Sequence, residues 1–370
     1  MNASKAYHKL IYILLLIIIV LSFASCKQKE NEKLPDMVYP EDVPENNIPE
    51  KDENISIPEN DDEEKEEEEI LPKPEHNKPH IPEPPNNNEI IEITKIEEIE
   101  KYLDMVYREN INRVWFSTYS NITQYYGYMF LYGGVEINPI TDFVNVKYKD
   151  TRPGIIRTKI DYIVIHDTGN NTRGADGNNH SKFINNNPGV SWHYTVDTKG
   201  IYHHIPDNEV AYHAGDGLRK SGSTYYNAIY KKTSITGGNM NGIGIETCVD
   251  SGSDYGTTLF NTANLVSELM IKHKLKIEDV KRHYDFSGKM CPQALIKSGY
   301  WEEFINYVKI CYFYKTELSD VTIRFESKSK YMDDLGRVSL QTPKGTIIDY
   351  VAYVESEGKK LEYKYSVKVK

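Results

Sequence analysis

The sequence predicts a mixed α/β domain, in which helices flank a central β-sheet, followed by a small β-rich module. The first observation is the apolar run Ile163–Ile165, which ends at polar residues and is typical of a buried strand. The second is Tyr194–Asp197 followed by Lys199-Gly200, a pattern that indicates a hairpin. The third is the segment 257–274, in which apolar residues such as Leu265, Leu269 and Met270 recur at helical spacing.

The α/β domain spans about residues 137–310, an ordinary size for one domain. Its apolar patterns predict strands at 161–166, 191–197, 200–205 and 242–248. Helices are predicted at 179–186, 257–274, 276–280 and 292–309. These elements together form the expected central sheet with its flanking helices.

The first 26 residues have the pattern of a secretory signal. Basic residues precede the apolar run Leu10–Leu21, and the small residues Ala24 and Ser25 follow it directly before Cys26. The run is short for a spanning helix, which needs about 20 apolar residues. Because the junction resembles the cleavage site of bacterial lipoproteins, we expect lipidation of Cys26 and anchoring to the outside of the membrane. An uncleaved N-terminal anchor and a plain cleaved signal are the alternatives.

Residues 27–95 predict a disordered, acidic tether. They hold 11 of the 17 prolines, and their 22 Asp and Glu residues stand against 8 Lys residues. The whole chain has a net charge of −11, so the acidity belongs to this segment and residues 96–370 are close to neutral. Such a composition cannot bury a core. As a flexible coil the tether reaches on the order of 45 Å, since the span grows as about 5–6 Å × √n.

Two further segments flank the α/β domain. Residues 96–136 form an extension that is helical in part, with Ile96, Ile99, Leu103 and Val106 at helical spacing. Its aromatic residues between 115 and 132 either pack against the next domain or stack on sugars. Residues 311–370 alternate apolar and polar residues between turn signals, which predicts a small β-sandwich-like module. That module is either a spacer or a cell-wall-binding element.

Three residues predict a metal site. His166 closes the apolar strand, while His283 and Cys291 lie eight residues apart in a loop with Gly288 and Pro292. Two imidazoles and one thiolate suit Zn²⁺, and three protein ligands leave a fourth position for water, as in catalytic zinc sites. The alternatives are a surface histidine at position 283 and an inert buried thiol at position 291. Of the other cysteines, Cys248 is expected to be buried, and no disulfide framework is visible.

The segment from about Tyr162 to Leu295 resembles the zinc-dependent N-acetylmuramoyl-L-alanine amidases of the type 2 class, a group that includes endolysins and peptidoglycan recognition proteins. The resemblance depends on five strings in the same order, IVIHDTG, SWHYTVD, AYHAGDG, GIGIETC and RHYDFSGKMCP. It implies one zinc ion per chain, held by His166, His283 and Cys291. It also implies the mixed α/β fold of that class.

The resemblance suggests roles for further residues. Glu246 lies between apolar neighbours in GIGIETC and is expected to act as general acid–base; the alternative is a surface-facing strand residue. Lys289 is expected to stabilise the oxyanion, unless it is a solvent-exposed loop lysine. Some relatives have a catalytic tyrosine where this chain has Trp192, which cannot carry a proton. Trp192, His193 and His213 are candidates for substrate contact, with a core or rim role as the alternative for the two histidines.

The expected activity is therefore hydrolysis of the amide between N-acetylmuramic acid and L-alanine, in turnover or lysis of the cell wall. A peptidoglycan-binding module without hydrolysis is the main alternative, and zinc chemistry alone would also allow a peptidase. A cytoplasmic amidase of muropeptide recycling is disfavoured by the signal pattern. Peptidoglycan and the membrane are the expected partners. We expect a monomer that faces the cell wall from the membrane and binds no nucleic acid.

Overall fold

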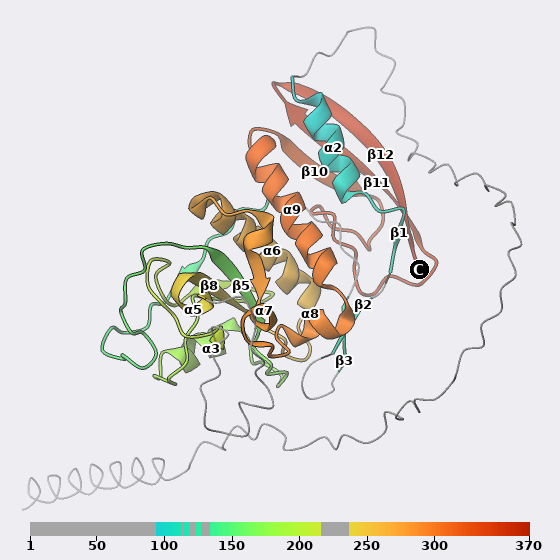
Figure 1. Cartoon of the computed structure of the whole chain (residues 1–370). Coiled ribbons are helices and arrows are strands. Elements are labelled where there is room, and N and C mark those ends of the chain that lie inside the picture. Colours follow the sequence, from blue (N-terminus) through green and yellow to red (C-terminus); the bar gives the residue numbers. More distant parts are fainter. Residues whose placement is uncertain (1–93, 113, 118–122, 127–133, 216–236) are drawn as a thin grey trace, which may run out of the picture. The chain divides into compact units, whose positions relative to one another are not determined.

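The computed structural model describes residues 94–112, 114–117, 123–126, 134–215 and 237–370 (Figure 1). The expected signal segment, Cys26 and the tether lie outside these residues, so the predictions for them stay predictions. In the described part of the chain, no helix is both long enough and apolar enough to cross a membrane.

The central sheet has six strands in the order β4-β7-β6-β8-β5-β9. Their bounds are β4 Ile140–Thr141, β5 Tyr162–Asp167, β6 Tyr194–Val196, β7 Ile201–His203, β8 Gly242–Thr247 and β9 Val280–Arg282. The strands β6, β8, β5 and β9 run parallel, whereas β6 and β7 form the predicted antiparallel hairpin. The four predicted strands are confirmed. The strands β4 and β9 were not predicted, since two or three residues carry too little alternation to be recognised.

The helices around this sheet are α3 Gly177–Ile184, α5 Gly238–Asn241, α6 Tyr255–His273, α7 His283–Ser287, α8 Gln293–Ser298 and α9 Trp301–Glu317. The predicted helix at 276–280 is the short 3₁₀ turn Ile277–Asp279. The single helix predicted at 292–309 is two helices. The break comes from Gly299, which adopts the left-handed backbone conformation (φ +68°) that commonly ends a helix.

The two faces of the central sheet have different surroundings. Ile163, Ile165, Ile243 and Ile245 point into the main hydrophobic core, which they share with α6, α8 and α9. The intervening positions of β5 and β8 point to the other face, where a smaller core of Val164, Ala214 and Phe286 lies. His166 and Glu246 belong to this second face because side chains alternate along a strand. The alternation therefore places both polar residues on the side opposite the main core.

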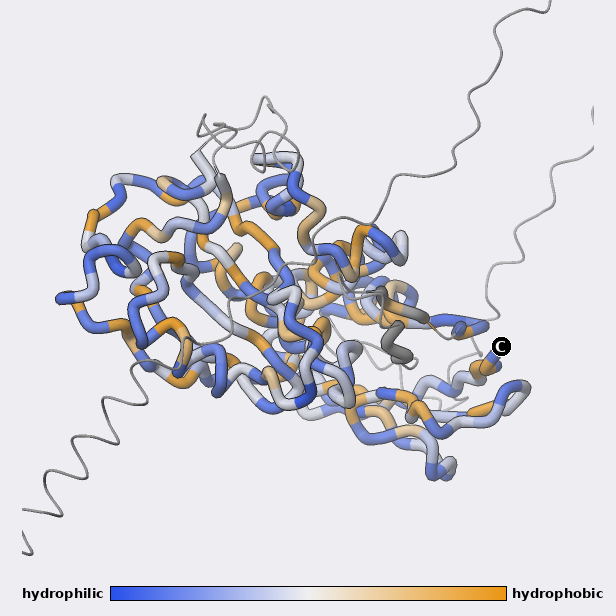
Figure 2. Tube along the Cα trace, turned by 90° about the horizontal axis from the view of Figure 1, so that it is seen from below, coloured by the Kyte–Doolittle hydropathy of each residue, from blue (hydrophilic) through white to orange (hydrophobic). Residues whose placement is uncertain are grey.

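The C-terminal residues form a second sheet of four strands in the order β1-β12-β11-β10. These are β1 Asn110–Ile111, β10 Thr322–Ser327, β11 Ile347–Ser356 and β12 Lys359–Val369. Buried and more exposed residues alternate along the long strands β11 and β12, so one face of the sheet packs in the core. Figure 2 shows hydrophobic and hydrophilic residues interspersed along the chain near its C-terminus. The expected β-sandwich-like arrangement is wrong. Helices share the core on the apolar face, so no second sheet is needed there.

The segment before the α/β domain joins this second sheet. The predicted helix is confirmed as α2 Ile96–Val106, and β1 pairs in parallel with the end of β12. The rings of Tyr107 and Tyr365 lie 5.2 Å apart, which brings the end of α2 against the sheet. Tyr102 of α2 contacts Tyr314 of α9 with ring centroids 5.3 Å apart. One hydrophobic core therefore runs from the central sheet through α6 and α9 to the C-terminal strands.

One expected boundary falls inside this continuous structure. The boundary between residues 310 and 311 lies within α9, whose buried face includes Cys311 and Tyr314.

In the aromatic-rich segment, β2 Val114–Ser117 pairs with β3 Thr123–Tyr126. Phe116 is buried there and makes edge contacts with Tyr255 and Tyr300. Phe116 therefore packs in the core, which agrees with the packing alternative predicted for these aromatic residues.

Candidate metal centre and catalytic site

The structure brings His166, His283 and Cys291 together. All three are buried, and one donor atom from each lies within 4.8 Å of the others. His166 Nδ1 is 3.8 Å from Cys291 Sγ. Bonds of about 2.0–2.1 Å to nitrogen and about 2.3 Å to sulfur in a tetrahedron separate these atoms by about 3.6 Å. The donor set and its spacing therefore fit a tetrahedral ion such as zinc.

Parallel pairing explains why the three donors meet. Ile165 of β5 pairs with Arg282 of β9, so His283, the next residue, emerges beside His166 at the same edge of the sheet. The loop that follows folds back because the backbone N–H of Tyr284 donates to the carbonyl of Cys291 over 2.9 Å. The thiol consequently returns to the two imidazoles.

Asp167 is a supporting residue that the sequence analysis did not single out. Its Oδ2 accepts a 2.8 Å hydrogen bond from the backbone N–H of Ala294, three residues after Cys291. Burial raises the pKa of Asp167 to about 6, although the backbone hydrogen bonds oppose this shift. The carboxylate ties the end of β5 to the segment that carries the thiol. Asp167 could have been identified from the sequence as a polar residue at the end of a buried strand.

The protonation of the three donors suits a metal. Burial holds the pKa of His166 and of His283 well below the ordinary histidine value, so both imidazoles are neutral and each has a lone pair to offer. Burial also raises the pKa of the Cys291 thiol. A bound cation offsets that effect because it stabilises the thiolate.

Glu246 faces this group from the neighbouring strand. It pairs with His166 in the register of β5 and β8, and its Oε1 lies 3.9 Å from His166 Nδ1. Its side chain is only 15% exposed, and among the described residues none donates a hydrogen bond to its Oε2. Burial raises the pKa of Glu246 to about 8, against the opposing charge of Lys289. A carboxyl group with this pKa can both take up and release a proton near neutral pH.

Lys289 lies in the loop between His283 and Cys291 and is half-buried. Burial raises the pKa of Glu246 and of Cys291, and the charge of Lys289 opposes both rises, so the ammonium group acts on the same small region. The backbone N–H of Cys291 donates to the carbonyl of Lys289 over 2.7 Å, which makes a tight turn between the two residues. The loop thus supplies a cation beside the metal donors.

Two of the three candidates for substrate contact are buried. Trp192 is 6% exposed, packs with Val144 and Ile184, and donates from Nε1 to Thr195 Oγ1 over 2.7 Å. His193 is fully buried, and its Nδ1 accepts a 3.0 Å hydrogen bond from the backbone N–H of Gly244. The geometry gives both side chains structural contacts, which favours the core alternative for His193 and a packing role for Trp192. His213 is half-buried, and its Nδ1 is 3.0 Å from His166 Nε2.

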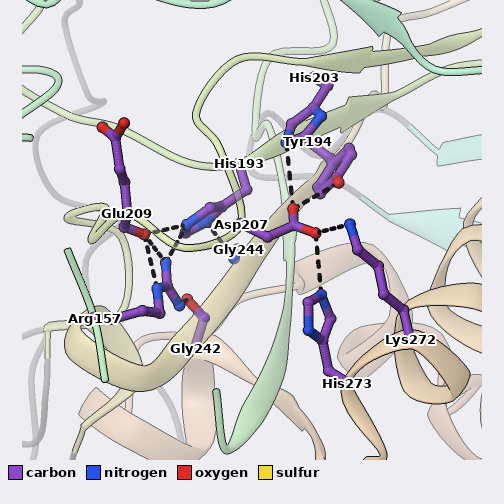
Figure 3. Close-up of polar contacts among 10 residues, drawn as sticks. All are labelled: Arg157, His193, Tyr194, His203, Asp207, Glu209, Gly242, Gly244, Lys272 and His273. Atoms are coloured by element: carbon purple, nitrogen blue, oxygen red, sulfur yellow. Dashed lines mark hydrogen bonds and ion pairs between the residues drawn. The ribbon is translucent and has the colours of Figure 1, made fainter. Parts of the chain in front are cut away.

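Figure 3 shows two polar groups that support the sheet around these residues. In the first, the guanidinium of Arg157 contacts His193 and donates to the carbonyls of Glu209 and Gly242. In the second, Asp207 accepts hydrogen bonds from the side chains of Tyr194, Lys272 and His273, and its Oδ1 lies 3.3 Å from His203 Nε2. Burial alone would raise the pKa of Asp207, but these contacts outweigh it and hold the pKa well below its usual range. The Asp207 group joins the β6–β7 hairpin to the end of α6.

Comparison with known proteins gives consistent matches. The family model for N-acetylmuramoyl-L-alanine amidase matches residues 156–294. The chain is 33% identical over 210 residues to the N-acetylmuramoyl-L-alanine amidase CwlH of Bacillus subtilis, covering 56% of this chain and 72% of that protein. It is 36% identical over 169 residues to the amidase XlyA of the same species, covering 45% of this chain and 50% of that protein. The solved catalytic domain of XlyA matches with a TM-score of 0.39 and 35% identity, covering 46% of this chain and 99% of that one.

Proposed function

We propose that this chain, which belongs to the N-acetylmuramoyl-L-alanine amidase family, hydrolyses the amide bond between N-acetylmuramic acid and L-alanine in peptidoglycan. One observation carries the proposal: a buried His/His/Cys donor set that a buried carboxyl group faces at 3.9 Å. A module that only binds peptidoglycan needs neither the donors nor the carboxyl group. The hydrolytic function is therefore favoured over binding alone.

We further propose that the donor set holds one zinc ion. The donor types and the 3.8 Å separation between nitrogen and sulfur support this metal. When bound, zinc supplies a Lewis acid for the scissile carbonyl and lowers the pKa of water at its open position. The two neutral imidazoles and the thiolate would hold the ion.

Glu246 and Lys289 have complementary roles in this mechanism. Glu246 takes the proton from the attacking water and then returns it to the leaving amine of L-alanine, as general base and then general acid. Its burial disfavours the ionised form, which helps the carboxyl group to hold the proton between the two transfers. The ammonium group of Lys289 stabilises the negative charge that develops on the attacked carbonyl oxygen.

Exposed apolar side chains next to the site are the candidates for holding the substrate. Tyr212, Tyr284 and Met290 are 37–41% exposed, and each is adjacent in sequence to a site residue. They offer accessible surface, which Trp192 and His193 do not. We propose that these three side chains contact the muropeptide.

The test is digestion of purified peptidoglycan by the zinc-loaded protein, followed by mass analysis of the released fragments. We expect free stem peptides that begin with L-alanine, and glycan strands that keep their lactyl groups. Treatment with a chelator should abolish the release, and added zinc should restore it. Cleavage within the stem peptide, or binding without any release, would contradict the proposal.

A separate proposal concerns location: the enzyme is held at the outer face of the bacterial membrane through Cys26. The support is the sequence pattern of residues 1–26 and the acidic tether that follows. Replacing Cys26 with Ala should release the protein from the membrane fraction or stall its processing. Replacing Ser25 with Ala, which keeps a small residue before the cysteine, is the matched control and should leave anchoring intact. A Cys26→Ala protein that is processed and fractionates like the wild type would exclude lipidation.

A further inference from the structure

His213 contacts His166, one of the three proposed metal donors, through the ring nitrogen of His166 that does not face Cys291. Its Nδ1 lies 3.0 Å from His166 Nε2, and the two rings meet edge to face with centroids 5.0 Å apart. The other ring nitrogen of His166, Nδ1, is the one that faces Cys291 and Glu246. His166 therefore offers one nitrogen to the metal site and the other to His213.

The direction of the hydrogen bond follows from the second contact of His213. Its Nε2 lies 3.3 Å from the carbonyl oxygen of Gly242, which can only accept. A neutral imidazole carries a single N–H, so in His213 this proton is on Nε2 and Nδ1 is an acceptor. His166 must then donate from its Nε2, and its Nδ1 keeps a free lone pair directed at Cys291 and Glu246.

The surrounding residues fix the ring of His213 in this orientation. The side chain of Asn239 accepts hydrogen bonds from the backbone N–H groups of His213 and Ala214, over 2.7 and 2.6 Å. Gly244 leaves the space that the ring fills, since a Cβ atom there would lie 2.8–2.9 Å from three ring atoms. The ring of His193 packs edge to face against the ring of His213, with centroids 5.8 Å apart. These contacts hold the His213 ring in one orientation more firmly than an acceptor at the protein surface would require.

We infer that His213 is a positioning residue of the metal centre: it holds His166 in the tautomer and orientation that present Nδ1 to the ion. The inference rests on the zinc site of the proposed function and replaces the expected substrate contact for His213. Residues that orient a metal-binding histidine in this way are worth roughly 10–100-fold in metal affinity. His213 acts through His166 and need not touch the substrate.

The experiment measures zinc affinity by competition with a chromogenic chelator, together with thermal unfolding, for three variants. His213→Phe keeps a ring but removes the acceptor, and its zinc affinity should fall roughly 10–100-fold. His213→Asn keeps an acceptor oxygen near the position of Nδ1 and should recover most of that loss. His273→Asn alters a histidine of the Asp207 group and should bind zinc like the wild type.

The outcomes separate this inference from the proposed function. A wild-type protein that binds no zinc overturns both the zinc centre and the inference. Tight binding by the wild type and equal binding by a folded His213→Phe variant overturn the inference alone. If His213→Phe does not fold, the smaller His213→Leu takes its place. An Asn variant that binds zinc no better than the Phe or Leu variant also overturns the inference, because simple loss of packing would then explain the effect.

Discussion

Replacing Glu246 with Gln should lower activity and, in the metal-free protein, raise stability. Gln keeps the size of the side chain and can still hydrogen-bond, but it cannot accept a proton. Losing a positioned acid–base group typically costs about 10²–10⁴-fold in rate. Zinc content should stay at the wild-type level, since Glu246 is not one of the three donors.

The expected gain in stability follows from the pKa of Glu246. Burial raises it from 4.5 to about 8 in the folded metal-free protein. The folded state therefore holds the proton more tightly than the unfolded chain, and stability falls as the pH rises from about 4.5 to about 8. Each pH unit in this window costs about 1.4 kcal/mol, which is on the order of 3 kcal/mol at pH 7. Gln has no proton to lose and avoids this cost.

Two measurements on the same preparations test this reasoning. Release of new L-alanine amino groups from peptidoglycan gives the activity of the zinc-loaded protein. Thermal unfolding after chelation, at several values of pH, gives the stability; a gain on the order of 3 kcal/mol at pH 7 raises Tm by roughly 5–10 °C. Glu362→Gln, which alters an exposed carboxylate on β12, is the control and should change neither quantity. Near-normal hydrolysis would remove the acid–base role, and a stability difference that does not vary with pH would refute the argument from burial.

Three more predictions concern the metal, the Asp207 group and the C-terminal sheet. Cys291→Ala should lose most of the zinc and the activity, as metal content per chain will show; a variant that keeps one zinc per chain would exclude the thiolate from the site. Asp207→Asn should lose roughly 2–4 kcal/mol of stability at pH 7. Because the folded pKa of Asp207 is held well below the unfolded value, this difference should begin to shrink as the pH falls below about 4 and should vanish only as the pH approaches the folded pKa; denaturant unfolding should therefore show a smaller difference at pH 3 than at pH 7. Deleting residues 318–370 should prevent cooperative folding, since each large apolar side chain that it removes from the core contributes about 1.5–3 kcal/mol against a total of about 5–15 kcal/mol; a truncated protein that melts like the full chain would contradict this.

The sequence was most informative where a pattern repeats over several residues or where the chemistry of a side chain is specific. The strand that carries Glu246 is apolar at every other position, so the strand and the face of Glu246 could be predicted, whereas the strand that carries His166 was predicted from its continuous apolar run. The donor set needs only residue types with known metal preferences, and the structure brings together the three residues that were chosen. These predictions used local information that tertiary packing did not override.

Other features depend on contacts between distant segments, and the sequence could not reveal them. Nothing near His213 in the chain indicates that its ring would meet His166, 47 residues earlier. Whether the indole of Trp192 faces the site depends on packing against Val144 and Ile184, which no local pattern reveals. The sandwich-like prediction for residues 311–370 failed for a similar reason: alternation shows that one face is buried, but not whether a helix or a sheet covers it.

The string Gly242-Ile243-Gly244-Ile245-Glu246 shows how a single strand combines these requirements. Its two isoleucines pack in the main core. On the other face, each position must leave room for the residues that pack against the strand. A Cβ at Gly242 would lie 2.3 Å from the carbonyl oxygen of Gly238, and a Cβ at Gly244 would meet the ring of His213. Only the last position on this face, beside His166 near the end of β5, has space for a long side chain, and Glu246 occupies it. The glycines therefore belong to the site as much as the carboxylate does: they create the space in which His213 can lie behind His166 while Glu246 faces the metal donors.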